Sequence, residues 1–291
     1  MGSSVELSVS EHVPEGSSVT DPLLVLVHGS LDRSTSFARV LRRLDDLHTV
    51  VYDRRGYHRS RGALPINDTL DGHIDDLLAV IDGRPAVVIG HSYGGDVALG
   101  ASLRPREASS IRAVAAYEPP MPWLAVWPKQ PVALPDGTPS TPTTDSTSPD
   151  DDAAAAERFF RRMVGDAAWD RLPDAGRAAR RADGPALAAE LRAIRVSEAP
   201  FDVGALAVPA IFGRGERSAP RSAGAPVHRS AMWPGIRPRG RWTVPAWSRP
   251  APSTGSSTWP APASATVVGP LPASASSWTA APRRPPPWWT P

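Results

Sequence analysis

The stretch "AVVIGHSYGGDVALGASL" (residues 86–103) decides the fold. Its first five residues form an apolar, β-branched run that predicts a strand, and its second half has apolar residues at helical spacing. Between them lies Gly90-His91-Ser92-Tyr93-Gly94, a Gly-x-Ser-x-Gly sequence. A serine on a sharp strand-to-helix turn exposes its hydroxyl beside the free N–H groups of the helix N-terminus, which suits nucleophilic catalysis. The alternative is a glycine-rich turn in which the serine only caps the helix.

A second loop complements the first. The segment "LVHGSLDRSTSF" (residues 26–37) begins at the end of another apolar run. Because parallel strands end at the same edge of a sheet, this loop is expected beside Ser92. Acyl transfer needs two N–H donors for the oxyanion, one from the residue after the nucleophile and one from such a loop. The candidates are the N–H groups of Tyr93 and Ser30; an ordinary turn is the alternative.

The rest of the first 220 residues alternates strand and helix patterns. Strands are predicted over 5–10, 23–27, 48–53, 86–90, 111–117 and 208–213, and helices over 37–44, 69–81 and 94–103. Strands separated by helices indicate βαβ units and a mostly parallel sheet.

Residues 119–207 interrupt this rhythm because they contain no strand candidate. We expect them to form a helical cap with a disordered loop at about 128–152. The predicted organisation is therefore a core over 1–118, the cap over 119–207, a late core strand within 208–220 and a tail over 221–291.

The tail differs in composition from everything before it. Residues 217–291 contain nine Arg, no Lys, Asp or Glu, and seven of the ten Trp. Proline occurs there too often for regular strands or helices, and only "TVVG" (266–269) hints at a short strand. Three explanations compete: a partner-binding Arg/Trp/Pro segment, a disordered linker, or a reading of the gene out of frame. We favour the last, because G+C-rich codons read out of frame yield this composition.

Composition also excludes several classes of protein. The chain has no cysteine, which removes disulfides, thiolate catalysis and Cys-ligated metals. Its N-terminus lacks the apolar core of a signal peptide, and no apolar run approaches transmembrane length. We expect a cytoplasmic protein with no cofactor, no metal, no membrane contact and no nucleic-acid binding by the core.

On the basis of these motifs, the chain resembles the α/β-hydrolase fold family over about residues 5–220. "HGS" (28–30), "YDRRGYHRS" (52–60) and "GHSYGG" (90–95) are similar to landmarks that follow successive strands of that family. The resemblance implies an α/β-hydrolase fold with a helical cap insertion, and a triad in the order Ser, acid, His. The C-terminal strand and helix of the family are atypical or missing here. A serine nucleophile argues against the haloalkane-dehalogenase and epoxide-hydrolase branches, which use Asp.

The resemblance leaves the acid open and the base hard to find. Glu216, in "GRGERSAP", and Glu118, in "AAYEPP", both follow strands where family members place the acid. An exposed salt-bridging role is the alternative for Glu216, and a loop- or cap-holding role for Glu118. Among seven histidines only His228 follows Glu216, and it comes too soon for the helix and strand that normally intervene. An incidental surface histidine is the alternative there, and the His91 side chain is expected to point away from Ser92.

These observations predict a serine hydrolase that acts on a carboxylic ester or related small acyl compound. The apolar "MPWLAVW" (121–127) suggests a hydrophobic acyl or alcohol group. The lack of a clear catalytic histidine predicts that this activity is impaired. The alternative is a non-catalytic protein that binds a small molecule or a partner on a hydrolase scaffold.

Overall fold

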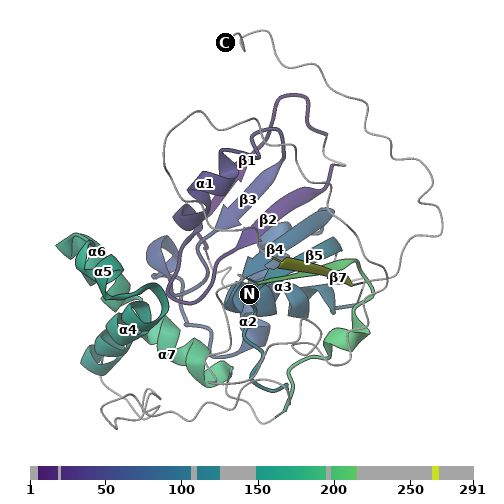
Figure 1. Cartoon of the computed structure of the whole chain (residues 1–291). Coiled ribbons are helices and arrows are strands. Elements are labelled where there is room, and N and C mark those ends of the chain that lie inside the picture. Colours follow the sequence, from purple (N-terminus) through teal and green to yellow (C-terminus); the bar gives the residue numbers. More distant parts are fainter. Residues whose placement is uncertain are drawn as a thin grey trace.

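A seven-stranded sheet forms the centre of the computed structural model, which describes residues 6–18, 21–105, 110–124, 149–194, 198–214 and 264–268. The strand order is β1-β3-β2-β4-β5-β6-β7 (Figure 1). The strands are β1 (Val9–His12), β2 (Leu23–Val27), β3 (Thr49–Tyr52), β4 (Ala86–His91), β5 (Ile111–Tyr117), β6 (Ala210–Arg214) and β7 (Ser264–Val268). All five inner strands run parallel, and the two edge strands β1 and β7 are antiparallel to their neighbours. The predicted mostly parallel α/β sheet is confirmed.

The helices of the core follow the predicted patterns with shifted ends. Helix α2 (Leu70–Ile81) begins where the Thr69 side chain accepts a hydrogen bond from the Gly72 N–H at 3.2 Å, and α3 is Tyr93–Ser102. The helix predicted over 37–44 is shorter, because a 3-10 turn η1 (Ser34–Phe37) precedes a single α-helical turn α1 (Ala38–Leu41). Two further 3-10 turns are η2 (His58–Ser60) and η3 (Val203–Ala205).

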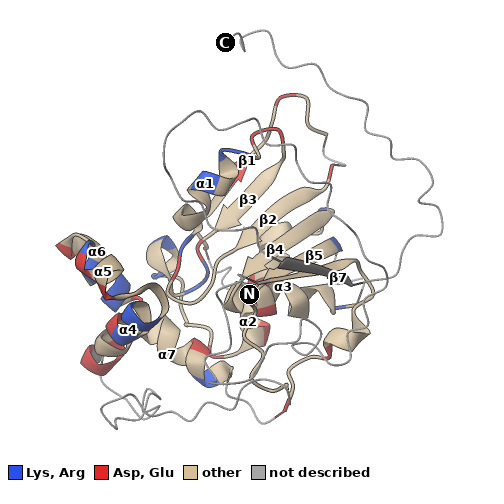
Figure 2. Cartoon of the chain, viewed as in Figure 1, with Lys and Arg blue, Asp and Glu red and all other residues tan. Residues whose placement is uncertain are grey.

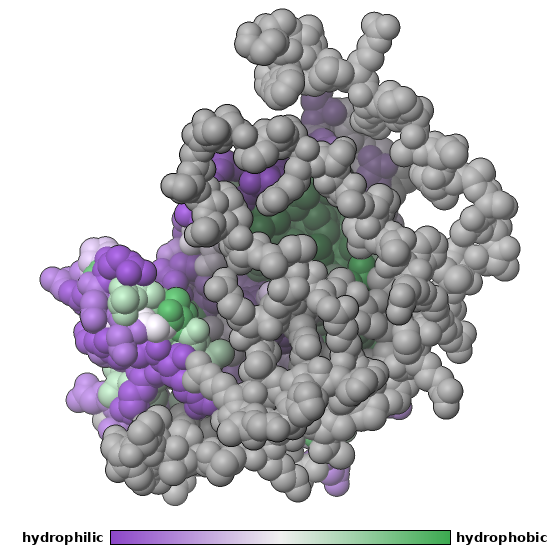
Figure 3. Space-filling view, viewed as in Figure 1, coloured by the Kyte–Doolittle hydropathy of each residue, from purple (hydrophilic) through white to green (hydrophobic). Residues whose placement is uncertain are grey.

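The two faces of the sheet differ in how well the described helices cover them. Helix α3 packs on β2, β4 and β5, with α2 beside it. The row of cross-strand neighbours on that face is fully buried: Val25, Val88, Val114 and Ala210. On the other face the row from Leu26 to Ile211 becomes more exposed toward β6, and Ile211 is 42% exposed. Figure 3 shows hydrophobic residues at the centre of the view, where Figure 1 has the sheet.

The described residues between β5 and β6 contain four α-helices: α4 (Pro149–Val164), α5 (Asp166–Asp170), α6 (Asp174–Ala182) and α7 (Gly184–Ala193). Figure 1 shows them beside the sheet, on the side toward which the arrowheads of β2 and β3 point. Acidic residues lie in the first turns of α4 and α6 and basic residues in their last turns, whereas the strands are almost free of charge (Figure 2). Of the loop predicted over 128–152, residues 149–152 are helical, and the rest lies outside the described residues.

A separate apolar cluster holds these helices together, and one core residue belongs to it. Leu31, from the loop after β2, is 3% exposed and has a φ of 52°. Its side chain packs among residues of α4, α5 and α7: Ala156, Phe160, Trp169 and Leu187. Its carbonyl oxygen accepts a hydrogen bond from Arg180 of α6. The loop after β2 is therefore built into the α4–α7 segment.

Part of the tail joins the sheet. Residues 264–268 form β7, which pairs antiparallel with β6 and includes most of the "TVVG" pattern noted in the sequence. The remaining residues after 214 lie outside the described part of the chain.

Candidate active site

Ser92 occupies a strained turn between β4 and α3. Its backbone has φ 52° and ψ −130°, which non-glycine residues rarely adopt. Two hydrogen bonds hold the turn: the Ser92 N–H donates to the Tyr117 carbonyl at 2.8 Å, and the Gly95 N–H donates to the Ser92 carbonyl at 2.7 Å. Such strain persists where the surroundings enforce it, and it is concentrated at functional sites. Ser92 is half-buried at the carboxyl edge of the sheet.

The two glycines around Ser92 are required by close backbone approach. A Cβ at Gly90 would lie 2.1 Å from the Gly94 carbonyl oxygen, and one at Gly94 would lie 2.3 Å from the Val27 carbonyl oxygen. Both contacts are with backbone atoms, which cannot move aside as a flexible side chain can. The Gly-x-Ser-x-Gly spacing is therefore a packing requirement of this turn, and it presses the start of α3 against the end of β2.

The loop after β2 lies directly beside Ser92. A Cβ at Gly29 would come within 2.8 Å of Ser92 Cβ and 3.4 Å of Ser92 Oγ. Ser30, the predicted second N–H donor, follows Gly29 and is half-buried. Tyr93, the other predicted donor, is the first residue of α3 and is 2% exposed. The structure thus brings the two predicted loops together around the serine.

His28 fixes the carbonyl of Gly29. The Arg54 N–H donates to His28 Nε2 at 2.9 Å, so this nitrogen is unprotonated and the proton sits on Nδ1. Nδ1 then donates to the Gly29 carbonyl at 2.8 Å. Burial, with the positive charge of Arg54 second, lowers the pKa of His28 to about 3. His28 is therefore a neutral, structural imidazole rather than a general base.

Arg54 is a buried cation in the loop after β3. It is 1% exposed, and its guanidinium donates to the carbonyls of His28 (Nε, 2.9 Å) and Gly29 (Nη2, 3.0 Å). Its Nη1 forms an ion pair with Glu190 of α7, which is also 1% exposed. Burial alone would lower the pKa of Arg54, but the Glu190 charge outweighs it and the pKa is raised. Sequence analysis missed both residues, because a loop arginine and a helix glutamate are normally exposed.

Of the two predicted acids, Glu118 belongs to the part of the chain that the structure describes. Glu118 follows β5 at the same edge as Ser92, with a φ of 53°, and its N–H donates to the Gly213 carbonyl at 2.9 Å. Since the Tyr117 carbonyl accepts from Ser92, Glu118 begins one peptide away from the serine turn. Glu216 lies outside the described residues.

No histidine in the described residues forms a hydrogen bond with the Ser92 hydroxyl. His91 packs its ring against Tyr117 at 5.9 Å between centroids, consistent with the expected orientation. Each of the other described histidines contacts another group: His12 contacts Asp45, His28 contacts Gly29, His48 contacts Glu11, His58 contacts Asp53, and His73 contacts Asn67 and Glu190. His228 lies outside the described residues.

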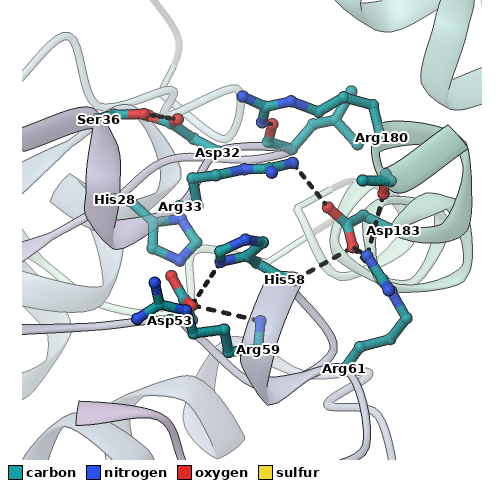
Figure 4. A network of polar contacts seen from close by, with 12 residues as sticks. His28, Asp32, Arg33, Ser36, Asp53, His58, Arg59, Arg61, Arg180 and Asp183 are labelled. Atoms are coloured by element: carbon teal, nitrogen blue, oxygen red, sulfur yellow. Dashed lines mark hydrogen bonds and ion pairs between the residues drawn. The ribbon is translucent and has the colours of Figure 1, made fainter. Parts of the chain in front are cut away.

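A polar network joins the loops beside Ser92 to the start of α7 (Figure 4). Asp53, at the end of β3, accepts from the Ser34 N–H at 2.7 Å and contacts His58 Nδ1 at 2.9 Å. Burial alone would raise the pKa of Asp53, but the hydrogen bonds from Ser34 and His58 outweigh it and the pKa is lowered. Asp183 is fully buried and binds the His58 N–H at 3.1 Å together with Arg33 and Arg61.

The part of the chain that the structure describes contains no group of three or more His, Asp or Glu placed to hold a metal ion. None of the helices described is long and apolar enough to cross a membrane.

The comparisons with known proteins agree with this architecture. Residues 24–221 match the sequence model of the alpha/beta hydrolase family, and the chain belongs to that family. Two curated relatives match shorter parts: an uncharacterized hydrolase, YraK, of Bacillus subtilis (37% identity over 103 residues, 34% of this chain and 37% of the relative) and the lipase LipV of Mycobacterium tuberculosis (31% over 112 residues, 37% and 40%). The matched regions span only about two fifths of each relative's length.

Solved structures share the fold at low sequence identity. An alpha/beta hydrolase from Sphaerobacter thermophilus aligns with a TM-score of 0.53 and 23% identity, covering 73% of this chain and 79% of that one. An enol-lactonase from Burkholderia xenovorans aligns with a TM-score of 0.53 and 20% identity, covering 73% and 78%. At these identities the likeness concerns the fold alone.

Proposed function

We propose that the chain is a serine hydrolase that cleaves a carboxylic ester or a related small acyl compound. Ser92 Oγ attacks the substrate carbonyl carbon, and the N–H groups of Ser30 and Tyr93 hold the oxygen as it becomes negative. Collapse of the tetrahedral intermediate releases the alcohol and leaves an acyl-serine, which water then hydrolyses. The observation that carries the proposal is the strained backbone of Ser92 with Gly29 packed against it.

The candidates for the acid and the base are the same residues that the sequence singles out. Six histidines contact other groups, so His228 is the remaining candidate for the base that takes the Ser92 proton. Glu118 and Glu216 are the candidate acids that would orient it. The position of Glu118, at the end of β5 and one strand from Ser92, supports it as a candidate.

The α4–α7 segment serves in this proposal as the cap over the acyl site. Its helices contact the loops that follow β2 and β3, through Leu31 and Asp183. A cap of this kind would exclude water and hold the apolar part of a substrate, as in hydrolytic sites that close over their ligands.

Active-site labelling with ester hydrolysis tests the proposal. The full chain is treated with a fluorophosphonate probe and, separately, with a short-chain nitrophenyl ester. We expect labelling and turnover that are lost in Ser92→Ala and retained in Ser110→Ala, whose hydroxyl binds the Arg84 carbonyl at the opposite end of the sheet. Glu118→Gln and Glu216→Gln then separate the two acids by which variant loses turnover.

The same experiment decides against a rival function. The absence of a histidine on the Ser92 hydroxyl in the described residues favours, as a second candidate, a non-catalytic binding protein on this scaffold. A folded wild-type chain that neither labels nor hydrolyses the ester would support that function and contradict the hydrolase.

A further inference from the structure

The Arg54 guanidinium connects three parts of the molecule that are distant in sequence. Arg54 itself belongs to the loop after β3. Its guanidinium donates to two carbonyls of the loop after β2 and pairs with Glu190 on α7. We propose that Arg54 is a positioning residue for the oxyanion donor at Ser30, and that Glu190 holds Arg54 in the orientation this requires. The inference rests on the proposed function, in which the Ser30 N–H binds the developing oxyanion.

The peptide bond between Gly29 and Ser30 links Arg54 to the oxyanion donor. The Gly29 carbonyl accepts hydrogen bonds from Arg54 Nη2 at 3.0 Å and from His28 Nδ1 at 2.8 Å. In a trans peptide the C=O and the following N–H point in opposite directions. Holding the Gly29 oxygen toward Arg54 therefore turns the Ser30 N–H away from it. Gly29 lies against Ser92. The Ser30 N–H, directed away from Arg54, therefore lies on the side of the loop that lines the site of Ser92.

An arginine is needed because its donors are rigidly spaced. Nε and Nη2 reach two successive carbonyls, His28 and Gly29, while Nη1 reaches Glu190. A lysine ammonium is a single point on a flexible chain and cannot reproduce this fork. The plane is held further by two aromatic rings, since the guanidinium carbon lies 5.0 Å from the centroid of Tyr57 and 5.1 Å from that of Tyr93.

Helix α7 is pressed against this loop by more than the ion pair. A Cβ at Gly56 would lie 2.6 Å from Ala186 Cβ, so the helix and the loop after β3 are in close contact one turn before Glu190. His73 Nε2 lies 3.5 Å from the same Glu190 oxygen that Arg54 binds. Removing Glu190 would leave a buried cation without its counter-ion, and the guanidinium would then turn toward other acceptors.

Arg54→Lys in the full chain is the first test, because it keeps the positive charge for Glu190 and removes the fork. Loss of a whole oxyanion donor costs about 10²- to 10³-fold in kcat. A misdirected donor should cost about 10- to 100-fold in kcat for the nitrophenyl ester, with KM nearly unchanged, because the donor acts on charge that develops after binding. The matched control is Arg55→Lys, on the neighbouring residue, whose guanidinium binds Asp76 and the Pro65 carbonyl instead of the loop after β2. It should retain the wild-type kcat.

A second readout does not depend on turnover. The ¹H and ¹⁵N chemical shifts of the Ser30 amide and its hydrogen-exchange rate report the orientation of this N–H. We expect both to change in Arg54→Lys and in Glu190→Ala, and to stay as in wild type in Arg55→Lys. An unchanged Ser30 amide in Arg54→Lys overturns the inference, and an unchanged one in Glu190→Ala overturns the role of Glu190.

The two readouts separate this inference from the proposed function. Wild-type protein without Ser92-dependent turnover would contradict the hydrolase, and the Ser30 amide would still decide whether Arg54 orients the peptide. A changed amide with unchanged kcat would overturn the catalytic part of the inference. A changed amide with reduced kcat and constant KM supports it.

Discussion

Gly29 and Ser92 lie so close together that a methyl group on Gly29 would come within 2.8 Å of Ser92 Cβ. The loop after β2 and the serine turn are thus packed backbone to side chain. This contact is the most direct link between the two motifs that the sequence singled out.

Gly29→Ala is expected to disable Ser92. The added carbon would also lie 3.1 Å from the His91 carbonyl oxygen, so the loop must move. Overpacking of this kind costs about 1–3 kcal/mol in the free energy of unfolding, and we expect fluorophosphonate labelling of Ser92 to fall sharply. The control is Gly62→Ala, because nothing lies within 4 Å of a Cβ at Gly62. Equal labelling of the two variants would contradict the packing argument.

Burial of His28 makes stability depend on pH. Its pKa is lowered to about 3 in the folded chain, so below its unfolded value of about 6.5 the unfolded state binds a proton that the folded state does not. The contribution of His28 to the free energy of unfolding is therefore fully present above pH 6.5. It is lost as the pH falls below that value, by about 1.4 kcal/mol per pH unit for this one group. Urea unfolding of wild type and His28→Asn between pH 6 and 4.5 measures this, and the variant should show the smaller slope. Parallel curves would contradict the assignment.

Asp183 is expected to stabilise the attachment of α7 to the core. Its side chain is fully buried and accepts from Arg33, Arg61 and the His58 N–H. Removing one partner of a buried ion pair costs about 3–5 kcal/mol. Asp183→Ala should lower the unfolding free energy by about that amount. Asp174→Ala, which removes an almost fully exposed partner of Arg177, should cost less than about 1 kcal/mol. Similar losses in the two variants would show that Asp183 is not an anchor.

The partly covered face of the sheet should limit solubility. Ile211 on β6 is 42% exposed, next to the half-buried Ala115 on β5. Apolar surface in water favours association by about 25 cal/mol for each Å² that association buries. We expect Ile211→Thr to raise the soluble fraction and to reduce binding of the dye ANS. Leu64→Thr is the control, because it removes a more exposed leucine that stands in a loop away from the sheet face. It should change both measures less than Ile211→Thr if a continuous apolar face, rather than the exposure of single residues, drives association.

The coding DNA tests the out-of-frame explanation of residues 221–291. If that explanation holds, one of the other two frames should encode a strand pattern ending in Gly-x-Gly-His, followed by a helix pattern. The measurement is a translation of the DNA in all three frames. Absence of the pattern from both alternative frames would favour a genuine Arg/Trp/Pro segment, and His228 would gain support as the base.

The sequence predicted the sheet well because each inner strand is a short apolar run between turns. The runs at 23–27 and 111–117 coincide with β2 and β5. The limits of the first strand differ from the prediction. The edge strand expected over 5–10 is β1 at Val9–His12, because pairing with β3 rather than hydrophobicity decides its limits.

The candidate site was predictable only in part. The Gly-x-Ser-x-Gly spacing pointed to the turn at Ser92, because those glycines answer a local steric demand that sequence can express. Arg54 and Glu190 are 136 positions apart, and their pairing depends on where α7 docks. No local pattern carries that information.

Leu31 has a consequence for engineering. Its side chain lies in the apolar cluster of α4–α7, although its backbone belongs to the loop beside Ser92. A chimera that exchanges α4–α7 for the equivalent region of another hydrolase would leave the Leu31 side chain without its apolar partners and exposed to water. The α4–α7 segment cannot be exchanged here as an independent module, and a successful graft must bring along the loop that Leu31 occupies.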